Sequence, residues 1–243
     1  MTMPEHAVLW GRTLIPFEIR RSGREKTVSI AVEPGGEVVV TAPQATDVER
    51  LRGLVREKAG WIVRRRRLLE SLDPAPTREF LSGETFLYRG RQHRLLVTTH
   101  DGPTEVKLEQ GRLVVRLPGA VLEKERPAQV ARALEAWFRR RAEAKLPEMV
   151  DACVLRAGLS AVPVQVVTQA KRWASCTSAG CIRLNWRLIQ APSRLVEYVV
   201  FHELTHLRLP NHDEAFWAAL GALLPDYERR KDDLRRLGPR LVW

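Results

Sequence analysis

The sequence predicts a mixed fold in which strands and helices occupy separate stretches of the chain. Short segments that alternate apolar and polar residues recur in residues 14–41 and again in residues 85–117, as in half-buried strands. Segments with apolar residues at helical spacing follow each group, in residues 48–69 and 127–150. The chain has 243 residues, of which 44% are hydrophobic, so it can bury one large core or two small ones.

The N-terminal part is expected to form a β-hairpin followed by a helix. A first strand is predicted at residues 14–20, and residues 27–33 and 37–41 flank the turn Pro34-Gly35-Gly36. Residues 46–49 read T-D-V-E, a capping box in which Thr46 would cap a single amphipathic helix reaching Leu69.

Asp73-Pro74-Ala75-Pro76 breaks this helix and is the best candidate linker in the chain. We therefore expect an N-terminal part, residues 1–76, and a second part, residues 77–243, with a single domain as the alternative. No internal repeat is evident from the sequence.

The second part begins with a small sheet and a long helix. Gln110-Gly111 turns the last pair of strands, and Pro127 opens a helix whose apolar stripe reaches Val150 with an interruption near Pro147. A further strand and a second hairpin around Ser178-Ala179-Gly180 come next. The strands of this part are predicted at residues 85–88, 93–99, 105–108, 112–117 and 162–168, and the hairpin at 171–185.

Composition bears on which partners the protein can bind and on where in the cell it is expected. The net charge of +11, from 40 basic and 29 acidic residues, is compatible with nucleic-acid binding through a basic surface or with solvated arginine-rich helices. The start, MTMPEHAVLW, has no secretory pattern, and no stretch approaches the length of a membrane span, so we expect a cytoplasmic protein without a membrane partner. Three cysteines, Cys153, Cys176 and Cys181, are expected to be free thiols.

Residues 199–216, VVFHELTHLRLPNHDEAF, hold three of the six histidines and the clearest functional signal. His202 and His206 lie four residues apart, so a helix places both imidazoles on one face, with Glu203 between them. Ser193 is the expected cap of this helix. His212 follows a turn at Pro210-Asn211 that lets the chain fold back over the same point.

Three histidines are a donor set that suits a catalytic Zn²⁺ ion. Such a site supplies three protein ligands and leaves one position open, whereas a structural site usually saturates the metal with cysteines. His202, His206 and His212 are therefore the predicted ligands and Glu203 the predicted general base for a zinc-bound water. Two alternatives are a structural zinc site and a pair of histidines that share a helix without binding metal.

The same region resembles a known family. The segments R-W-A-S-C, C-I-R-L-N, E-Y-V-V-F-H-E-L-T-H-L and N-H-D-E-A-F-W are similar to the YgjP-like family of predicted zinc metallohydrolases, whose catalytic core resembles SprT-like and other zincin proteases. The resemblance spans most of the chain. It implies an α+β fold whose zincin-like core combines a long helix, a small sheet and the HExxH helix, after an N-terminal hairpin, helix and sheet region. One departure is Ala174, where the family more often has glycine.

Two further side chains could support the predicted chemistry. Tyr198 lies one turn before His202 and would donate to an oxyanion, or would simply pack. Asp213 would accept a hydrogen bond from a ligand imidazole, or would cap the helix that follows.

The leading prediction is a zinc metallopeptidase acting on polypeptides. Residues 172–176 are placed to be the edge strand that pairs with an extended substrate, which makes Arg172, Trp173 and Ser175 candidate substrate-binding residues. One alternative is a nucleotide pyrophosphohydrolase, with Lys171, Arg172 and Arg183 orienting a triphosphate. Another is a non-catalytic module that associates with nucleic acid and holds a structural zinc.

Overall fold

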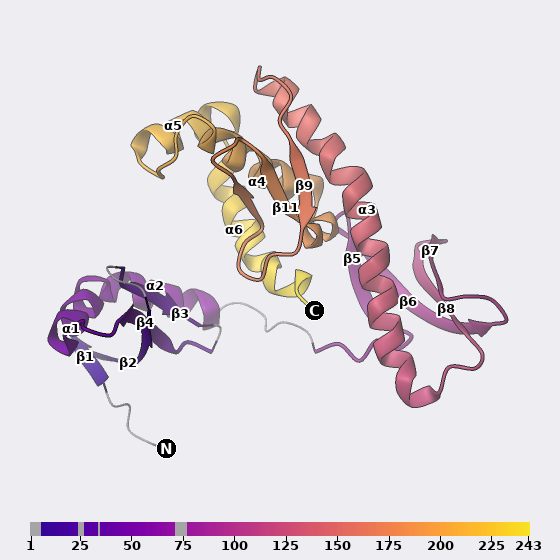
Figure 1. Cartoon of the computed structure of the whole chain (residues 1–243), viewed down its shortest axis with the longest axis horizontal. Helices are drawn as coiled ribbons and strands as arrows, with labels where there is room; N and C mark the ends of the chain where they lie inside the picture. The colour runs from indigo at the N-terminus through magenta and orange to yellow at the C-terminus, as the bar shows by residue number, and fades with distance from the viewer. Residues whose placement is uncertain (1–5, 24–26, 34, 71–76) are drawn as a thin grey trace. The chain divides into compact units, whose positions relative to one another are not determined.

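The computed structural model describes residues 6–23, 27–33, 35–70 and 77–243. The chain divides into two compact units, Met1–Asp73 and Pro74–Trp243, each with its own hydrophobic core (Figure 1). The predicted linker at residues 73–76 lies outside the described residues, as does Pro34 of the first predicted turn. Among the described residues, no helix has both the length and the apolar character needed to cross a bilayer.

The N-terminal unit is a four-stranded sheet packed against two helices. The strand order is β1-β2-β4-β3, in which β2 and β4 are parallel and both outer pairs are antiparallel. Apolar side chains from the strands and from both helices, such as Ile15, Val40, Leu51 and Ile62, are fully buried and form the core. The elements are β1 (His6–Trp10), β2 (Thr13–Ser22), β3 (Ser29–Val32), β4 (Val38–Pro43), α1 (Val48–Glu57) and α2 (Ala59–Glu70).

The predicted β3–β4 hairpin is confirmed, but three details of this unit differ from the sequence prediction. The strand β1 was not predicted. The predicted single helix is divided at Lys58 into α1 and α2, so that Ala59 and Ile62 stay buried in the same core as the α1 residues. The cap of α1 is Asp47, whose carboxylate accepts from the backbone N–H groups of Glu49 and Arg50, whereas the N–H of Thr46 donates to the carbonyl of Pro43.

The C-terminal unit contains two sheets and four helices, joined by short 3₁₀ helices. The elements are β5 (Thr85–Tyr88), β6 (Arg91–His100), β7 (Glu105–Glu109), β8 (Arg112–Pro118), η1 (Glu123–Glu125), α3 (Arg126–Arg156), β9 (Val164–Val167), β10 (Ala174–Cys176), β11 (Ile182–Asn185), η2 (Trp186–Gln190), α4 (Ser193–His206), α5 (Glu214–Leu223), α6 (Tyr227–Leu237) and η3 (Gly238–Leu241).

The long helix α3 contacts the first sheet, the second sheet and α4. The second sheet has the order β10-β11-β9, with β10 antiparallel and β9 parallel to β11, so β10 is an edge strand. The predicted long helix is confirmed, and it continues through Pro147, near which the sequence showed an interruption of the apolar stripe. Leu146 and Val150 on either side are fully buried, and this packing outweighs the one hydrogen bond that Pro147 cannot donate. The predicted α+β class, with a long helix, a small sheet and the histidine-bearing helix packed together, is confirmed.

The first sheet of this unit repeats the topology of the N-terminal sheet. Its order is β5-β6-β8-β7, and again the central pair β6–β8 is parallel and both outer pairs are antiparallel. In both units the second strand has ten residues and the fourth strand is followed by a helical region. The two units therefore share a four-strand motif, which was not evident as a repeat in the sequence.

Candidate metal centre

The helix α4 brings two histidines to one face. Its apolar residues Leu195, Val196, Val199 and Val200 are buried in the core of the C-terminal unit, which fixes the helix and the direction of its histidine side chains. The expected cap, Ser193, is instead the first helical residue; Pro192 occupies the cap position and makes no side-chain capping bond.

The third histidine reaches the same point after α4 ends. The N–H of Leu209 donates to the carbonyl of Thr205 at 3.0 Å, and the chain then turns back through Pro210. Nε2 of His212 lies 2.9 Å from Nε2 of His202 and 3.2 Å from Nε2 of His206. The structure thus brings the three predicted ligands together, and their candidate ligand atoms lie within 4.8 Å of one another.

This donor set fits a metal ion better than it fits a hydrogen-bond network. Two imidazole nitrogens can share one proton, but three that face a common point cannot all be satisfied by protons. In a tetrahedral zinc site with bonds of about 2.0–2.1 Å, neighbouring nitrogens lie roughly 3.3 Å apart, close to the separations found here. The three histidines therefore fit a zinc ion.

Aromatic side chains at the start of α5 hold the ligand rings. The ring of Phe216, which is fully buried, lies 5.0 Å from that of His202 and 4.6 Å from those of His206 and His212. Nε1 of Trp217 donates to the carbonyl oxygen of His212 at 3.1 Å. The sequence analysis did not predict this role, although the position of both aromatics just after His212 was the available signal.

The protonation state of the histidines suits metal binding. Burial, followed by the nearby His206 and His212, lowers the pKa of His202 to about 4, and burial lowers the pKa of His212. The imidazoles of His202 and His212 are therefore neutral at neutral pH. Nδ1 of His206 lies 3.1 Å from the carbonyl oxygen of Leu209, a contact that leaves Nε2 free to bind a metal.

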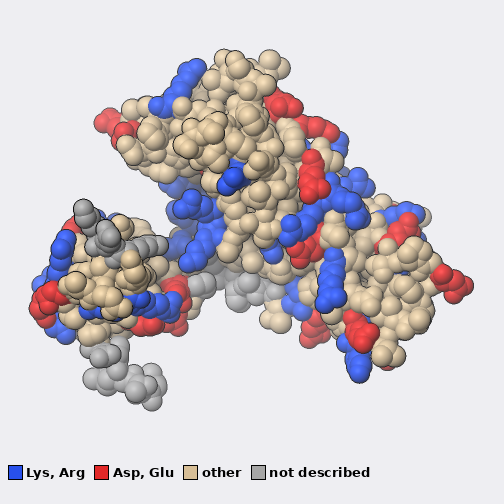
Figure 2. All heavy atoms as spheres, viewed as in Figure 1, with Lys and Arg blue, Asp and Glu red and all other residues tan. Residues whose placement is uncertain are grey.

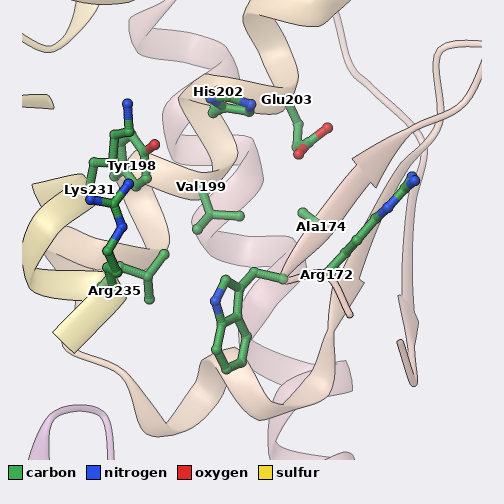
Figure 3. Close-up of a pocket in the computed structure, with 10 residues that line it drawn as sticks. Arg172, Ala174, Tyr198, Val199, His202, Glu203, Lys231 and Arg235 are labelled. Carbon is green, nitrogen blue, oxygen red and sulfur yellow. The ribbon is translucent and has the colours of Figure 1, made fainter. Parts of the chain in front are cut away.

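Glu203 lies beside the histidines but outside the converging set (Figure 3). Its side chain is buried, with 7% of the residue exposed. Burial raises the pKa of Glu203 to about 7, although a hydrogen bond from the backbone N–H of Cys176 and the charge of Arg172 act in the opposite direction. A carboxyl group with a pKa near neutrality can both accept and return a proton.

The edge strand β10 runs beside Glu203. The N–H of Thr177 donates to the carbonyl of Cys181, and the N–H of Asn185 donates to the carbonyl of Trp173. The backbone groups of the odd-numbered residues in and around β10 therefore face β11. In an antiparallel pair the alternate residues then direct their backbone groups outward. Cys176 follows this rule, because its N–H reaches Glu203, and the backbone of Ala174 faces the same open edge.

Two hollows meet at His202 and Glu203. One, with a volume of about 590 Å³, is lined by β10, by the turn after it and by all three histidines. The other, of about 360 Å³, lies between α4, α6 and the segment before β10. Arg172 and Ala174 line both of them.

The remaining predicted residues are distributed around these hollows. Tyr198 has 8% of its surface exposed, its ring lies 6.1 Å from that of His202, and burial raises its pKa to about 12. Arg172 and Trp173 line the smaller hollow, while Ser175 lines the larger one and accepts from Nε2 of Gln169. Asp213 accepts from the N–H of Phe216 at 3.0 Å and so caps α5, one of the two roles that the sequence left open.

Comparison with known proteins places the chain in a family. No curated protein matches it. Two solved structures are similar to part of this chain. The metallopeptidase zymogen of Methanocaldococcus jannaschii jannalysin has a TM-score of 0.34 and 18% identity, over 39% of this chain and 95% of that one. The metallopeptidase zymogen of Pyrococcus abyssi abylysin has a TM-score of 0.36 and 19% identity, over 40% of this chain and 99% of that one.

The family match covers far more of the chain. The sequence model of the family described as YgjP-like, metallopeptidase domain, matches residues 26–237, which include every residue of the site described above. The resemblance predicted from the R-W-A-S-C and H-E-L-T-H segments is therefore confirmed: this chain belongs to the YgjP-like family of metallopeptidase domains.

Proposed function

We propose that this protein is a zinc-dependent metallopeptidase in which His202, His206 and His212 hold the metal and Glu203 is the general base. The observation that carries the proposal is the convergence of three Nε2 atoms, 2.9 and 3.2 Å apart, next to a buried carboxylate that is not one of them. This arrangement leaves a coordination position for chemistry, as catalytic zinc sites require.

A zinc ion bound there supplies Lewis acidity, which polarises a carbonyl group and makes water more acidic. Glu203 accepts the proton that the attacking water loses and delivers it to the leaving amine. Its pKa of about 7 suits both steps, and the N–H of Cys176 holds the carboxylate in place. Tyr198, protonated at neutral pH, is a candidate donor to the oxygen of the attacked carbonyl.

The edge of β10 favours a polypeptide substrate. Ala174 directs its backbone toward the open side of the strand, next to the residue that holds Glu203. An extended peptide that pairs with this edge would lie across the site, and the backbone bonds would position it without regard to its sequence.

A nucleotide pyrophosphohydrolase is the second candidate. The observation that favours it is the group of cations beside the site, namely Arg172, Lys231 and Arg235, which line the smaller hollow. Of the other two residues proposed for phosphate binding, Arg183 instead donates to Oε1 of Gln165. This candidate does not use the β10 edge, so we rank it below the peptidase.

Nucleic-acid association through the basic surface receives little support. Arg66, in the basic run of α2, donates to the carbonyls of Gly36 and Pro16, and Arg139 of α3 forms a salt bridge with Glu135. Figure 2 shows acidic residues beside lysines and arginines at several places on the visible face. Solvation and ion pairing account for these basic side chains.

The proposal is tested by assaying the zinc-loaded protein and its Glu203→Gln variant on peptides, unfolded proteins and nucleoside triphosphates. We expect the variant to keep one zinc per chain and to lose peptide hydrolysis by a factor of at least about 100. Full activity of Glu203→Gln on peptides contradicts the assigned role. Glu203-dependent release of phosphate or diphosphate from nucleotides, without peptide cleavage, selects the second candidate.

A further inference from the structure

The smaller hollow beside the metal centre has an apolar interior and a charged rim. Val199 of α4, Leu234 of α6 and Trp173 contribute apolar surface, while His202 and Glu203 form the side next to the metal centre. Figure 3 shows Tyr198, Lys231 and Arg235 gathered on one side of this pocket. A substrate residue next to a bond cleaved at the metal would therefore place its side chain here.

Two cations on α6 form part of the rim. Lys231 and Arg235 lie four residues apart and so share one face of the helix. The helix is fixed on α4 by two ion pairs, Arg230 with Glu197 at 2.9 Å and Arg194 with Asp233 at 2.6 Å. The positions of the two cations are therefore set by the fold and not only by their flexible side chains.

The charges of this rim are incompletely neutralised. Arg235 pairs with Asp232 at 3.1 Å, but neither Lys231 nor Arg172 has a salt bridge within the described part of the chain. The ammonium of Lys231 lies 4.4 Å from the ring centre of Trp217, and its charge lowers the pKa of His202 and His212. Among the described residues that line the pocket, three are cations and Glu203 is the single carboxylate.

We propose that this pocket recognises a carboxylate on the residue next to the scissile bond, which makes the protein a peptidase with a preference for acidic residues. The inference rests on the proposed function. A glutamate or aspartate side chain, or a free C-terminal carboxylate, brings a negative charge to Lys231 and Arg235 while its methylene groups contact Val199 and Leu234. A lysine or arginine in the same place is repelled by Lys231 and Arg235.

The test compares peptides that differ only in one residue, glutamate, glutamine or lysine, placed on either side of the cleaved bond. Each peptide is made with a C-terminal amide and with a C-terminal acid, so that a side-chain carboxylate and a terminal one are distinguished. We expect kcat/KM to fall from glutamate to glutamine to lysine, with at least about a tenfold difference between the extremes. A preference for the acid over the amide form supports the terminal carboxylate as the source.

The next part of the test reverses the charge of Lys231 and Arg235 on α6 and compares the result with a control on the same helix. The double variant Lys231→Glu, Arg235→Glu should reverse the order, so that lysine is favoured, while zinc content and melting temperature stay close to wild type. Arg236→Glu is the control, because Arg236 is exposed on the same helix and does not line the pocket. It should leave the order unchanged. A second readout uses the zinc-loaded Glu203→Gln variant, which should bind peptides without cleaving them. With a fluorescent label on each peptide, we expect this variant to bind the glutamate peptide more tightly than the lysine peptide.

The outcomes separate this inference from the proposed function. Equal cleavage of all three peptides, with no difference between the acid and amide forms, overturns the acidic preference and leaves the peptidase standing. An unchanged order in the double variant overturns the role of Lys231 and Arg235. Absence of Glu203-dependent peptide cleavage overturns both proposals. Hydrolysis of nucleoside triphosphates that is lost on changing Lys231 and Arg235 assigns the cations to phosphate and also overturns the preference.

Discussion

At the scale of single residues, Asp213 connects the metal centre to the fold. Its carboxylate accepts from the N–H of Phe216 and caps α5. The residue before it is His212, and Phe216 packs against all three ligand rings. One hydrogen bond therefore fixes the start of the helix, the buried aromatic and the third predicted ligand. Whether Asp213 also acts on an imidazole stays a prediction.

Replacement of Asp213 distinguishes these two roles. Asp213→Ala should lower the free energy of unfolding by about 1 kcal/mol, the usual cost of losing a cap. It should also weaken zinc binding, since His212 is then less well fixed. Asp213→Asn keeps a side-chain oxygen that caps equally well and should preserve both properties. Urea denaturation and zinc titration against a competing chelator measure them. If Asn weakens zinc binding as much as Ala does, the carboxylate charge acts on a ligand.

At the scale of elements, the turn between β5 and β6 joins the first sheet of the C-terminal unit to the segment that precedes α4. The N–H of Arg89 donates to the carbonyl of Ile189, and the N–H of Gly90 donates to that of Gln190, both at 2.9 Å. Gly90 has a φ of +79°, and a Cβ built on it would lie 2.7 Å from Cγ of Pro192. This close approach requires glycine.

A matched pair of glycines tests the importance of this junction. Gly111, in the turn between β7 and β8, has a similar φ of +76° but no atom within 4 Å of a built Cβ. Gly111→Ala should therefore cost about 1 kcal/mol of backbone strain. Gly90→Ala should cost clearly more, because the methyl group also displaces Pro192 at the start of α4. Thermal and urea denaturation give the comparison. Equal losses in the two variants would show that the junction does not bear on stability.

Local sequence patterns predicted the histidine-bearing helix and most strands, because periodicity and turn residues act over a few neighbours. The Gln110-Gly111 turn is an example, with φ of +47° and +76° at the two positions. The features that the sequence did not predict depend on tertiary contacts. They include the continuity of α3 through Pro147, the break at Lys58 and the contact of Phe216 with the ligand rings.

At the scale of the whole molecule, the shared four-strand motif was hidden from sequence reasoning because strand order is a non-local property. One copy belongs to the core that includes α3 and α4, and the other has a core of its own. The helices that come after the two copies differ in surroundings: Trp61 of α2 has 42% of its surface exposed, whereas Trp137 of α3 has 3%. We propose that the two units are separate domains.

Expression of residues 77–243 alone tests this division. Because every residue of the proposed site and the core around it belong to this part, the fragment should bind one zinc and hydrolyse short peptides within about twofold of the full chain. Its unfolding should be cooperative. A fragment that is unfolded, or folded without zinc binding, would mean that the N-terminal unit completes the structure.

Zinc K-edge X-ray absorption on the loaded full-length protein tests the central claim most directly. We predict a shell of nitrogen and oxygen atoms at about 2.0–2.1 Å, with the outer-shell scattering of three imidazoles. The His212→Ala variant should show two imidazoles. A sulfur shell at about 2.3 Å would mean that Cys176 or Cys181 binds the zinc, and it would contradict the three-histidine site. The same conclusion follows if His212→Ala leaves the number of imidazoles unchanged.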